Sequence, residues 1–298
     1  MWTLLRRSWL VLVLGCGVWV EAGEALGVLE RFRSLGRSAE WRQAGEVVLD
    51  FETYHPQGMV WMGDRFFLSS VEVIQRAEGK GRGHVFEVGV DGKLRRSILL
   101  GEGAAYHPGG IDFDGEHVWV SVAEYRPDSW SVVYRVDPET MEAERVFEFA
   151  DHIGALVCDR ERRWLVGVSW GSRRWYRWDL DEGARGLAAG KGVEMRVNGS
   201  FYVDYQDGQV VEGGGYALFG GLSTLSAGGS SVVLGGLDLV DLRELRAVHQ
   251  LPVLLRAPGG RSLLQNPWAV EVWGEGLRFY FIPEDGRSVM YRYDVLPE

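Results

Sequence analysis

A short stretch that occurs twice decides the fold: HPQGMVWMG at residues 55–63 and HPGGIDFDG at residues 107–115. A β-rich run follows each copy, FFLSSVE at 66–72 and VWVSVAE at 118–124. The spacing inside the two copies is identical, because each β-rich run ends on a Glu that stands 17 residues after its His. Self-similarity of this kind is the signature of a repeat architecture.

Weaker copies continue the series with DHIGA at 151–155, YQDG at 205–208 and NPWAV at 266–270. Successive copies therefore start 45 to 61 residues apart. A second pattern, alternating and strand-like, recurs as VYRVD, WYRWD and MYRYD, at residues 133–137, 175–179 and 290–294. Units of about 50 residues with four short strands have the size of a β-propeller blade.

The predicted fold is an all-β, five-bladed β-propeller over residues 45–298. The last copy stops after its third strand, so we expect the segment 45–52 to pair with 289–295 and complete that blade. Six blades are the alternative, because the strand pattern blurs around the Gly- and Ser-rich segment 220–231. Residues 24–44 are predicted to form a short amphipathic helix, packed outside, through the apolar residues Leu26, Leu29, Phe32 and Leu35.

The N-terminus predicts export. Arg6 and Arg7 precede an apolar run at 9–20, and small residues follow, which is the pattern of a signal peptide over residues 1–23. The run is too short for a membrane span. Two alternatives stay open: a twin-arginine signal, and a lipid anchor on Cys16. The expected location is periplasmic, extracellular or anchored to the outer membrane.

Charge and cysteine content limit the classes of binding partner and the disulfides that the chain can form. The formal net charge is −10, from 42 acidic and 32 basic residues, and no basic block follows the leader, so nucleic acid is excluded as a partner. With Cys16 in the leader, Cys158 has no partner for an intramolecular disulfide and is expected to be buried filler. A small-molecule ligand is the expected partner, and a monomer is the favoured state.

The His-Pro-x-Gly and Tyr-Arg-x-Asp units resemble an uncharacterised family of secreted bacterial and fungal β-propellers, filed as a domain of unknown function. The resemblance covers nearly the whole mature chain and implies a fold and an exported location, with no established activity. More distantly, the repeats are similar to gluconolactonase and strictosidine-synthase propellers, some of which bind a cation on the axis. None of the metal-ligand motifs of those propellers is found in this sequence.

The candidate site follows from blade geometry. His55, His107 and His152 begin innermost strands, so all three are expected at one mouth of the central channel. Glu72 and Glu124 end second strands on the same face and are the candidate catalytic bases. The three imidazoles are tentative ligands for a divalent metal ion. The alternative is that His-Pro only shapes the turn before each strand.

Further residues are predicted around this mouth. The innermost strands of the last two copies are expected to begin at Tyr205 or Gln206 and at Asn266. Ser169 occupies the repeat position of the two glutamates, and Arg126 lies in a charged loop. The candidate ligand-binding residues are therefore Tyr205, Gln206, Asn266, Arg126 and Ser169. Asp112 and Glu271 share one repeat position and are expected to pair with Arg between blades.

Two functions are consistent with these residues. The first is a propeller that binds a small polar ligand at the mouth, with or without a divalent metal, and whose His and Glu residues suit metal-assisted hydrolysis or elimination. The second is a non-catalytic module that docks another exported protein or a glycan. Whether the chain is an enzyme stays open at this point.

Overall fold

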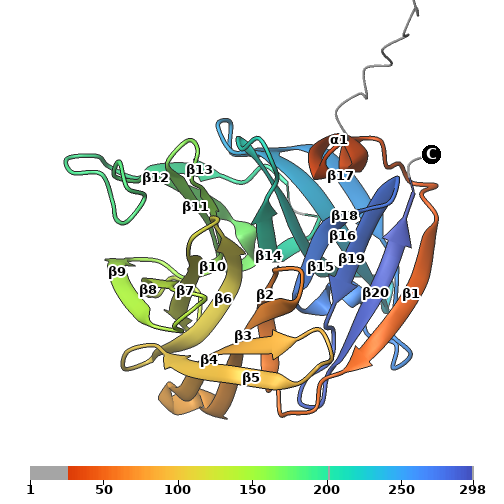
Figure 1. The fold of residues 1–298 in the computed structure, drawn as a ribbon, viewed down its shortest axis with the longest axis horizontal. Helices are drawn as coiled ribbons and strands as arrows, with labels where there is room; N and C mark the ends of the chain where they lie inside the picture. The colour runs from red at the N-terminus through yellow and green to blue at the C-terminus, as the bar shows by residue number, and fades with distance from the viewer. Residues whose placement is uncertain (1–25, 201, 297–298) are drawn as a thin grey trace, which may run out of the picture.

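The computed structural model describes residues 26–200 and 202–296 and is a β-propeller (Figure 1). The predicted signal peptide at 1–23, with Arg6, Arg7 and Cys16, lies outside the described residues. The described strands fall into five groups of four antiparallel strands, and we call each group a blade. Blades 2 and 3 are joined at one parallel pair between their innermost strands, Gly110 and Ala155.

The blades follow one another along the chain. Blade 1 contains β2 (His55–Trp61), β3 (Arg65–Gln75), β4 (Lys80–Gly89) and β5 (Leu94–Leu100). Blade 2 contains β6 (Ala105–Phe113), β7 (Val118–Glu124), β8 (Ser131–Val136) and β9 (Ala143–Phe149). Blade 3 contains β10 (Ile153–Asp159), β11 (Trp164–Ser169), β12 (Arg174–Asp179) and β13 (Glu194–Val197).

Blade 4 contains β14 (Asp204–Val210), β15 (Tyr216–Ala227), β16 (Ser230–Asp241) and β17 (Arg246–Val253). Blade 5 contains β18 (Trp268–Trp273), β19 (Gly276–Phe281), β20 (Val289–Val295) and, from the start of the chain, β1 (Trp41–Val48). Four short helical turns complete the described elements: α1 (Val28–Arg33), η1 (Arg76–Glu78), η2 (Trp170–Ser172) and η3 (Leu263–Gln265).

The predicted closure of the ring is confirmed. β1 is antiparallel to β20, with Val48 opposite Val289 and Val47 opposite Met290. Figure 1 shows the orange β1 along the outside of the blue β20. The pairing begins at Trp41, before the predicted start at residue 45, and passes a bulge between Gln43 and Gly45. Closure removes two exposed sheet edges, which would otherwise offer unpaired backbone groups to other chains.

The N-terminal helix is shorter than expected. Of the segment 24–44, the structure describes residues 26–44, and within them only Val28–Arg33 is α-helical, after which the chain leads into β1. Phe32 and Leu35 are fully buried against blades 4 and 5, whereas Leu26 is 58% exposed and takes no part in the apolar face. The helix thus fills a gap between two blades. Among the described residues, no helix is long and apolar enough to cross a bilayer.

Buried serines tie each of the first two blades to its neighbour. Ser69 Oγ donates to the carbonyl of Gly109 at 2.7 Å, and Ser121 Oγ donates to the carbonyl of Ile153 at 2.8 Å. Both serines stand 14 residues after the His of their copies. A buried hydroxyl requires such a partner. The repeat therefore encodes a contact between blades as well as a strand.

One buried carboxylate links four blades at the axis of the propeller. Asp207 in β14 accepts four backbone amides: Oδ1 from Ile111 and Gly208, and Oδ2 from Met59 and Trp268, at 2.8 to 3.4 Å. These amides belong to the innermost strands of blades 1, 2, 4 and 5. Burial raises the pKa of Asp207 well above its usual range, while the four amides oppose that shift by stabilising the anion.

The prediction that Asp112 and Glu271 pair with Arg side chains is wrong. Asp112 Oδ2 accepts the backbone amides of Cys158 at 3.0 Å and Val210 at 3.3 Å, so it links blade 2 to blades 3 and 4. Glu271 accepts Trp61 Nε1 and the Tyr280 hydroxyl. Neutral donors, backbone amides for Asp112 and aromatic side chains for Glu271, therefore satisfy these carboxylates.

Candidate functional site

The innermost strands begin at a polar cavity of about 300 Å³ at one mouth of the channel, which we call the mouth cavity. The structure brings the three predicted histidines together on its wall. Its described lining comes from four blades and the η3 turn: His55, Gln57, His107, Tyr125, His152, Gly154, Ser169, Trp170, Gly171, Asp204, Tyr205, Gln206 and Gln265.

Close backbone packing beneath the cavity explains the glycines of the repeat. A Cβ on Gly58 would lie 2.5 Å from the amide nitrogen of Ile111, and one on Gly109 would lie 2.3 Å from the carbonyl oxygen of Gly154. Any larger residue would push the innermost strands apart. Gly58 and Gly109, both within the His-Pro-x-Gly segments, therefore allow close approach at the axis, and each His lies at the edge of the hollow above it.

His107 is a neutral imidazole with a free ring nitrogen. Its Nδ1 is buried and has no hydrogen-bond partner among the described residues. Burial, reinforced by the neighbouring His152 and His55, holds the pKa of His107 well below its usual value. The ring stacks on Tyr125, with centroids 4.0 Å apart, while the Arg76 guanidinium lies 3.9 Å from the same Tyr centroid. Two groups this close require opposite faces of Tyr125, so Tyr125 is fixed between them.

His152 is also neutral, and its tautomer is defined. Its Nδ1 lies 2.8 Å from the carbonyl oxygen of Glu124, which can only accept, so Nδ1 carries the proton and Nε2 is an acceptor. Burial lowers the pKa of His152, partly offset by that hydrogen bond. Trp170 lies edge-on to His152, with centroids 4.8 Å apart. His107 and His152 themselves are 5.4 Å apart by ring centroid.

His55 differs from the other two because it has a carboxylate partner. Its Nδ1 is 2.7 Å from Asp285 Oδ1. Burial alone would raise the pKa of Asp285, but hydrogen bonds from His55, Arg261 and Asn266 outweigh it and lower the pKa to about 2. Asn266 is buried and donates to Asp285, so it supports the His55 pair from behind the cavity wall.

The three histidines do not form a metal-binding cluster with their surroundings. Within residues 26–200 and 202–296, no group of three or more His, Cys, Asp or Glu side chains is placed to hold a metal ion. His55 bonds to Asp285 and His152 to a carbonyl oxygen, which fixes each ring separately. The tentative metal assignment to His55, His107 and His152 therefore receives no geometric support.

The two candidate catalytic glutamates are turned to other partners. Glu72 is paired with Arg82 at 3.1 Å and His84 at 3.2 Å. Glu124 accepts Trp130 Nε1 at 2.8 Å and forms an ion pair with Arg126. Neither glutamate belongs to the lining of the mouth cavity. Glu124 ends β7 beside Tyr125, which lines the cavity, whereas Glu72 lies within β3 and no residue of that strand belongs to the lining.

The five predicted ligand-binding residues divide into two groups. Ser169, Tyr205 and Gln206 line the mouth cavity, whereas Arg126 and Asn266 do not. The Tyr205 hydroxyl is committed to Asp238 at 2.6 Å, and Ser169 Oγ accepts the amide of Arg174 at 2.9 Å.

Several lining residues were missed by sequence reasoning. Gln57 stands two residues after His55, and Gln265 and Asp204 directly precede Asn266 and Tyr205. Polar residues beside each predicted strand start were the available signal. Trp170 gave no such signal, because its place depends on the turn that follows β11.

Comparison with known sequences assigns the chain to a family. The family model described as "Family of unknown function (DUF6454)" matches residues 19–297. The chain belongs to this family. The DUF6454 match covers the whole propeller, in agreement with the expected uncharacterised propeller family, and it supplies no activity. No curated protein matches the chain in sequence.

Solved structures share the fold of this DUF6454 chain at low identity. The tail fibre of Staphylococcus aureus phage P68 has a TM-score of 0.52 and 9% identity, over 90% of this chain and 55% of that one. Kuenenia stuttgartiensis hydrazine synthase has a TM-score of 0.40 and 14% identity, over 80% and 58%. The WD40 repeats of RRP9 have a TM-score of 0.44 and 11% identity, over 86% and 100%.

The DUF6454 chain thus spans less than two thirds of the phage and hydrazine synthase chains. At these identities the likeness concerns the fold alone. The more distant resemblance to gluconolactonases and strictosidine synthases stays a prediction.

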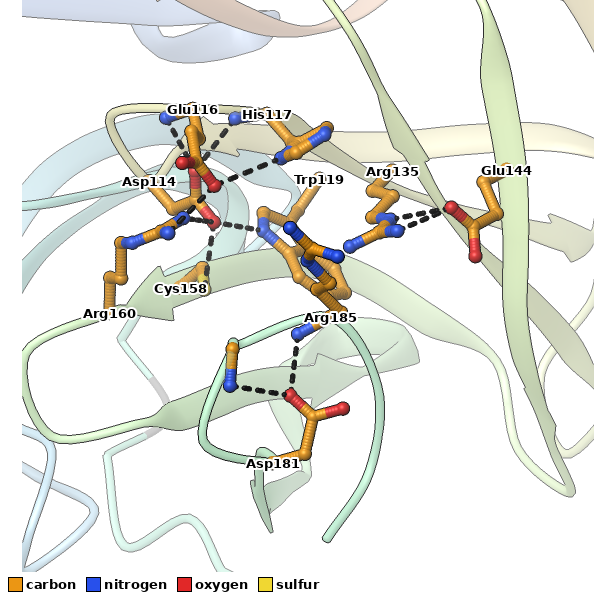
Figure 2. Close-up of polar contacts among 11 residues, drawn as sticks. Asp114, Glu116, His117, Trp119, Arg135, Glu144, Cys158, Arg160, Asp181 and Arg185 are labelled. Carbon is orange, nitrogen blue, oxygen red and sulfur yellow. Dashed lines mark hydrogen bonds and ion pairs between the residues drawn. The ribbon is translucent and has the colours of Figure 1, made fainter.

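Where β6 ends, this DUF6454 chain carries a second polar cluster, away from the mouth cavity (Figure 2). Asp114 accepts the amides of Glu116 and His117, Trp119 Nε1 at 2.9 Å, and Arg160 Nη1 at 3.4 Å. Cys158 Sγ lies 4.0 Å from Asp114 Oδ2. Burial, together with the nearby carboxylates, raises the pKa of the Cys158 thiol, in keeping with the filler role predicted for it.

Proposed function

We propose that the chain binds a small, uncharged, polar molecule in the mouth cavity. The observation that carries this proposal is the convergence of three imidazoles, those of His55, His107 and His152, on one polar cavity. Polar side chains in a confined cavity cost free energy unless they meet water, a ligand or each other, and a ligand group that bonds to them would recover part of that cost.

Charge considerations support an uncharged ligand. The lowered pKa values of His107 and His152 leave both imidazoles neutral near pH 7, and His55 is matched by Asp285. The three carboxamides of the lining, Gln57, Gln206 and Gln265, add donors and acceptors without charge. The carboxylate of the described lining, Asp204, is already paired with Arg173, so a desolvated ion would find little counter-charge to offset its dehydration.

Binding is better supported than catalysis. The glutamates that could act as bases are paired with cations outside the cavity, and Asp285 is held ionised by three donors. A general base must reach the proton that it removes. The cavity instead offers aromatic walls from Tyr125 and Trp170 with polar groups between them, the usual composition of a recognition site.

Replacing His107 by Ala should weaken ligand binding about tenfold, because one buried hydrogen bond is worth about 1 kcal/mol or more. Neutral monosaccharides, polyols, nucleosides and amides would be screened by thermal shift, and affinities measured by calorimetry. His117→Ala, in the turn between β6 and β7 and outside the cavity lining, is the matched control. The proposal fails if no compound stabilises the protein, or if both variants weaken binding equally.

The affinity for a ligand in the mouth cavity should decrease on acidification. The pKa values of both rings are lowered from 6.5, so the acceptor nitrogens stay free above pH 6.5 and are lost on acidification. The free energy of unfolding should also decrease as the pH falls below 6.5, because the unfolded chain then binds more protons than the native one. We therefore expect constant affinity from pH 7 to 8 and a fall only on acidification below pH 6.5, where the lowered pKa values of the two rings are reached. An affinity that rises on acidification would contradict neutral imidazoles as acceptors.

A further inference from the structure

The mouth cavity continues into a second hollow of about 400 Å³, which we call the outer hollow. Three residues, Trp170, Gly171 and Asp204, belong to the lining of both. The remaining residues of the outer hollow are Pro127, Asp128, Arg173 and Arg174, from the loop after β7 and the turn before β12. A ligand that fills the mouth cavity can therefore extend outward past the Trp170 side chain.

The turn that carries Trp170 is held in an uncommon backbone conformation. Gly171 and the buried Ser172 both have positive φ angles, +61° and +54°. Ser172 Oγ accepts the amide of Tyr205 at 2.6 Å, and its carbonyl accepts Asn198 Nδ2 at 2.9 Å. Asp128 on the facing loop also has a positive φ of +46°. Such residues persist where the surroundings enforce them and are concentrated at binding sites.

The charges of the outer hollow are internally balanced. Arg174 Nη2 lies 2.6 Å from Asp128 Oδ1, and Arg174 Nε lies 3.1 Å from Asp151. Arg173 forms an ion pair with Asp204. These planar groups present fixed donors and acceptors with little net charge. Hydroxyl groups, which donate and accept at once, match such a surface better than a phosphate or an ammonium group does.

Given the proposed function on which this step rests, we propose that the natural ligand is a neutral oligosaccharide of at least two units. One unit occupies the mouth cavity between the histidines and amides, and the next lies against Trp170 in the outer hollow. The carbon-bound hydrogens of a sugar face pack on an indole ring, while its hydroxyls bond to the flanking carboxylates and guanidinium groups. A rigid turn keeps Trp170 in place for that contact, which lowers the entropic cost of binding.

Calorimetry on the full chain tests this proposal with glucose, mannose, xylose and N-acetylglucosamine and with their neutral oligomers of two to six units. We expect at least one oligomer to bind about tenfold more tightly than its monomer. Trp170→Ala should abolish that advantage, because it weakens binding of the oligomer about tenfold more than binding of the monomer, while Trp170→Phe should retain part of it. Trp273→Ala, at an exposed Trp on blade 5, is the control and should change neither affinity.

The outcomes separate this proposal from the one on which it rests. Equal affinity of monomer and oligomer, with both sensitive to His107→Ala, overturns the oligosaccharide and keeps the mouth site. Binding of a compound other than a sugar, if it depends on His107 but not on Trp170, likewise overturns the oligosaccharide proposal and keeps the mouth cavity as the binding site. Sugar binding that is insensitive to both His107→Ala and Trp170→Ala overturns both proposals. An oligomer advantage that survives Trp170→Ala refutes the extension past Trp170.

Discussion

Asp207→Asn is expected to lower the free energy of unfolding by about 3 kcal/mol or more. Both oxygens of Asp207 accept backbone amides, two on each side. An Asn side chain must turn its amino group toward one pair of these donors, which leaves two buried N–H groups unsatisfied. Because the amides belong to four blades, the loss acts on the closure of the whole ring.

Asp112→Asn is the matched control for this prediction. The two amides that Asp112 accepts from other blades, those of Cys158 and Val210, both bond to Oδ2, so a single amide oxygen can replace it. Urea denaturation should show a change within about 1 kcal/mol for this variant. Equal destabilisation of the two variants would contradict the bridging role of Asp207.

Gly109→Ala is the second change with a large expected effect, a loss of about 2 kcal/mol or more. The new Cβ would lie 2.3 Å from the carbonyl oxygen of Gly154, and backbone cannot move aside as a side chain can. Gly154→Ala is the control at the same repeat position, since the atoms nearest to its Cβ are 3.8 Å away. That variant should be unchanged or slightly more stable, because Ala restricts the unfolded chain.

Thermal and urea unfolding of the two glycine variants measure this difference directly. We expect Gly109→Ala to unfold at a clearly lower urea concentration and Gly154→Ala to unfold at the same concentration as the parent chain. Identical midpoints would mean that the innermost strands can separate freely, contrary to the close packing at the axis.

Repeat spacing was sufficient to predict the propeller and its closure from sequence. The two clear copies at His55 and His107 defined the unit, and the incomplete final copy implied pairing with the N-terminal strand. The ties across the axis were not predictable in this way. Asp207 lies in a degraded copy, and its four donors come from strands that meet only in three dimensions. Local pattern carries no information on such contacts.

The candidate site shows the same division. Equivalent repeat positions placed His55, His107 and His152 on one cavity, because they begin innermost strands. The side-chain orientations of Glu72 and Glu124 depend instead on ion pairs, which they form with Arg82 and Arg126. Side-chain partners of this kind vary from copy to copy and cannot be read from the period.

The place where a bound compound lies decides whether the mouth cavity is the binding site. A crystal structure with the best-binding compound of the screen should show it in the mouth cavity, with a polar atom within hydrogen-bond distance of a His107 ring nitrogen and the Trp170 ring alongside. A larger hollow of about 560 Å³ lies at the edge of blade 5, beside Arg42 and Trp273. A compound bound there, with the mouth cavity left to water, would contradict the account.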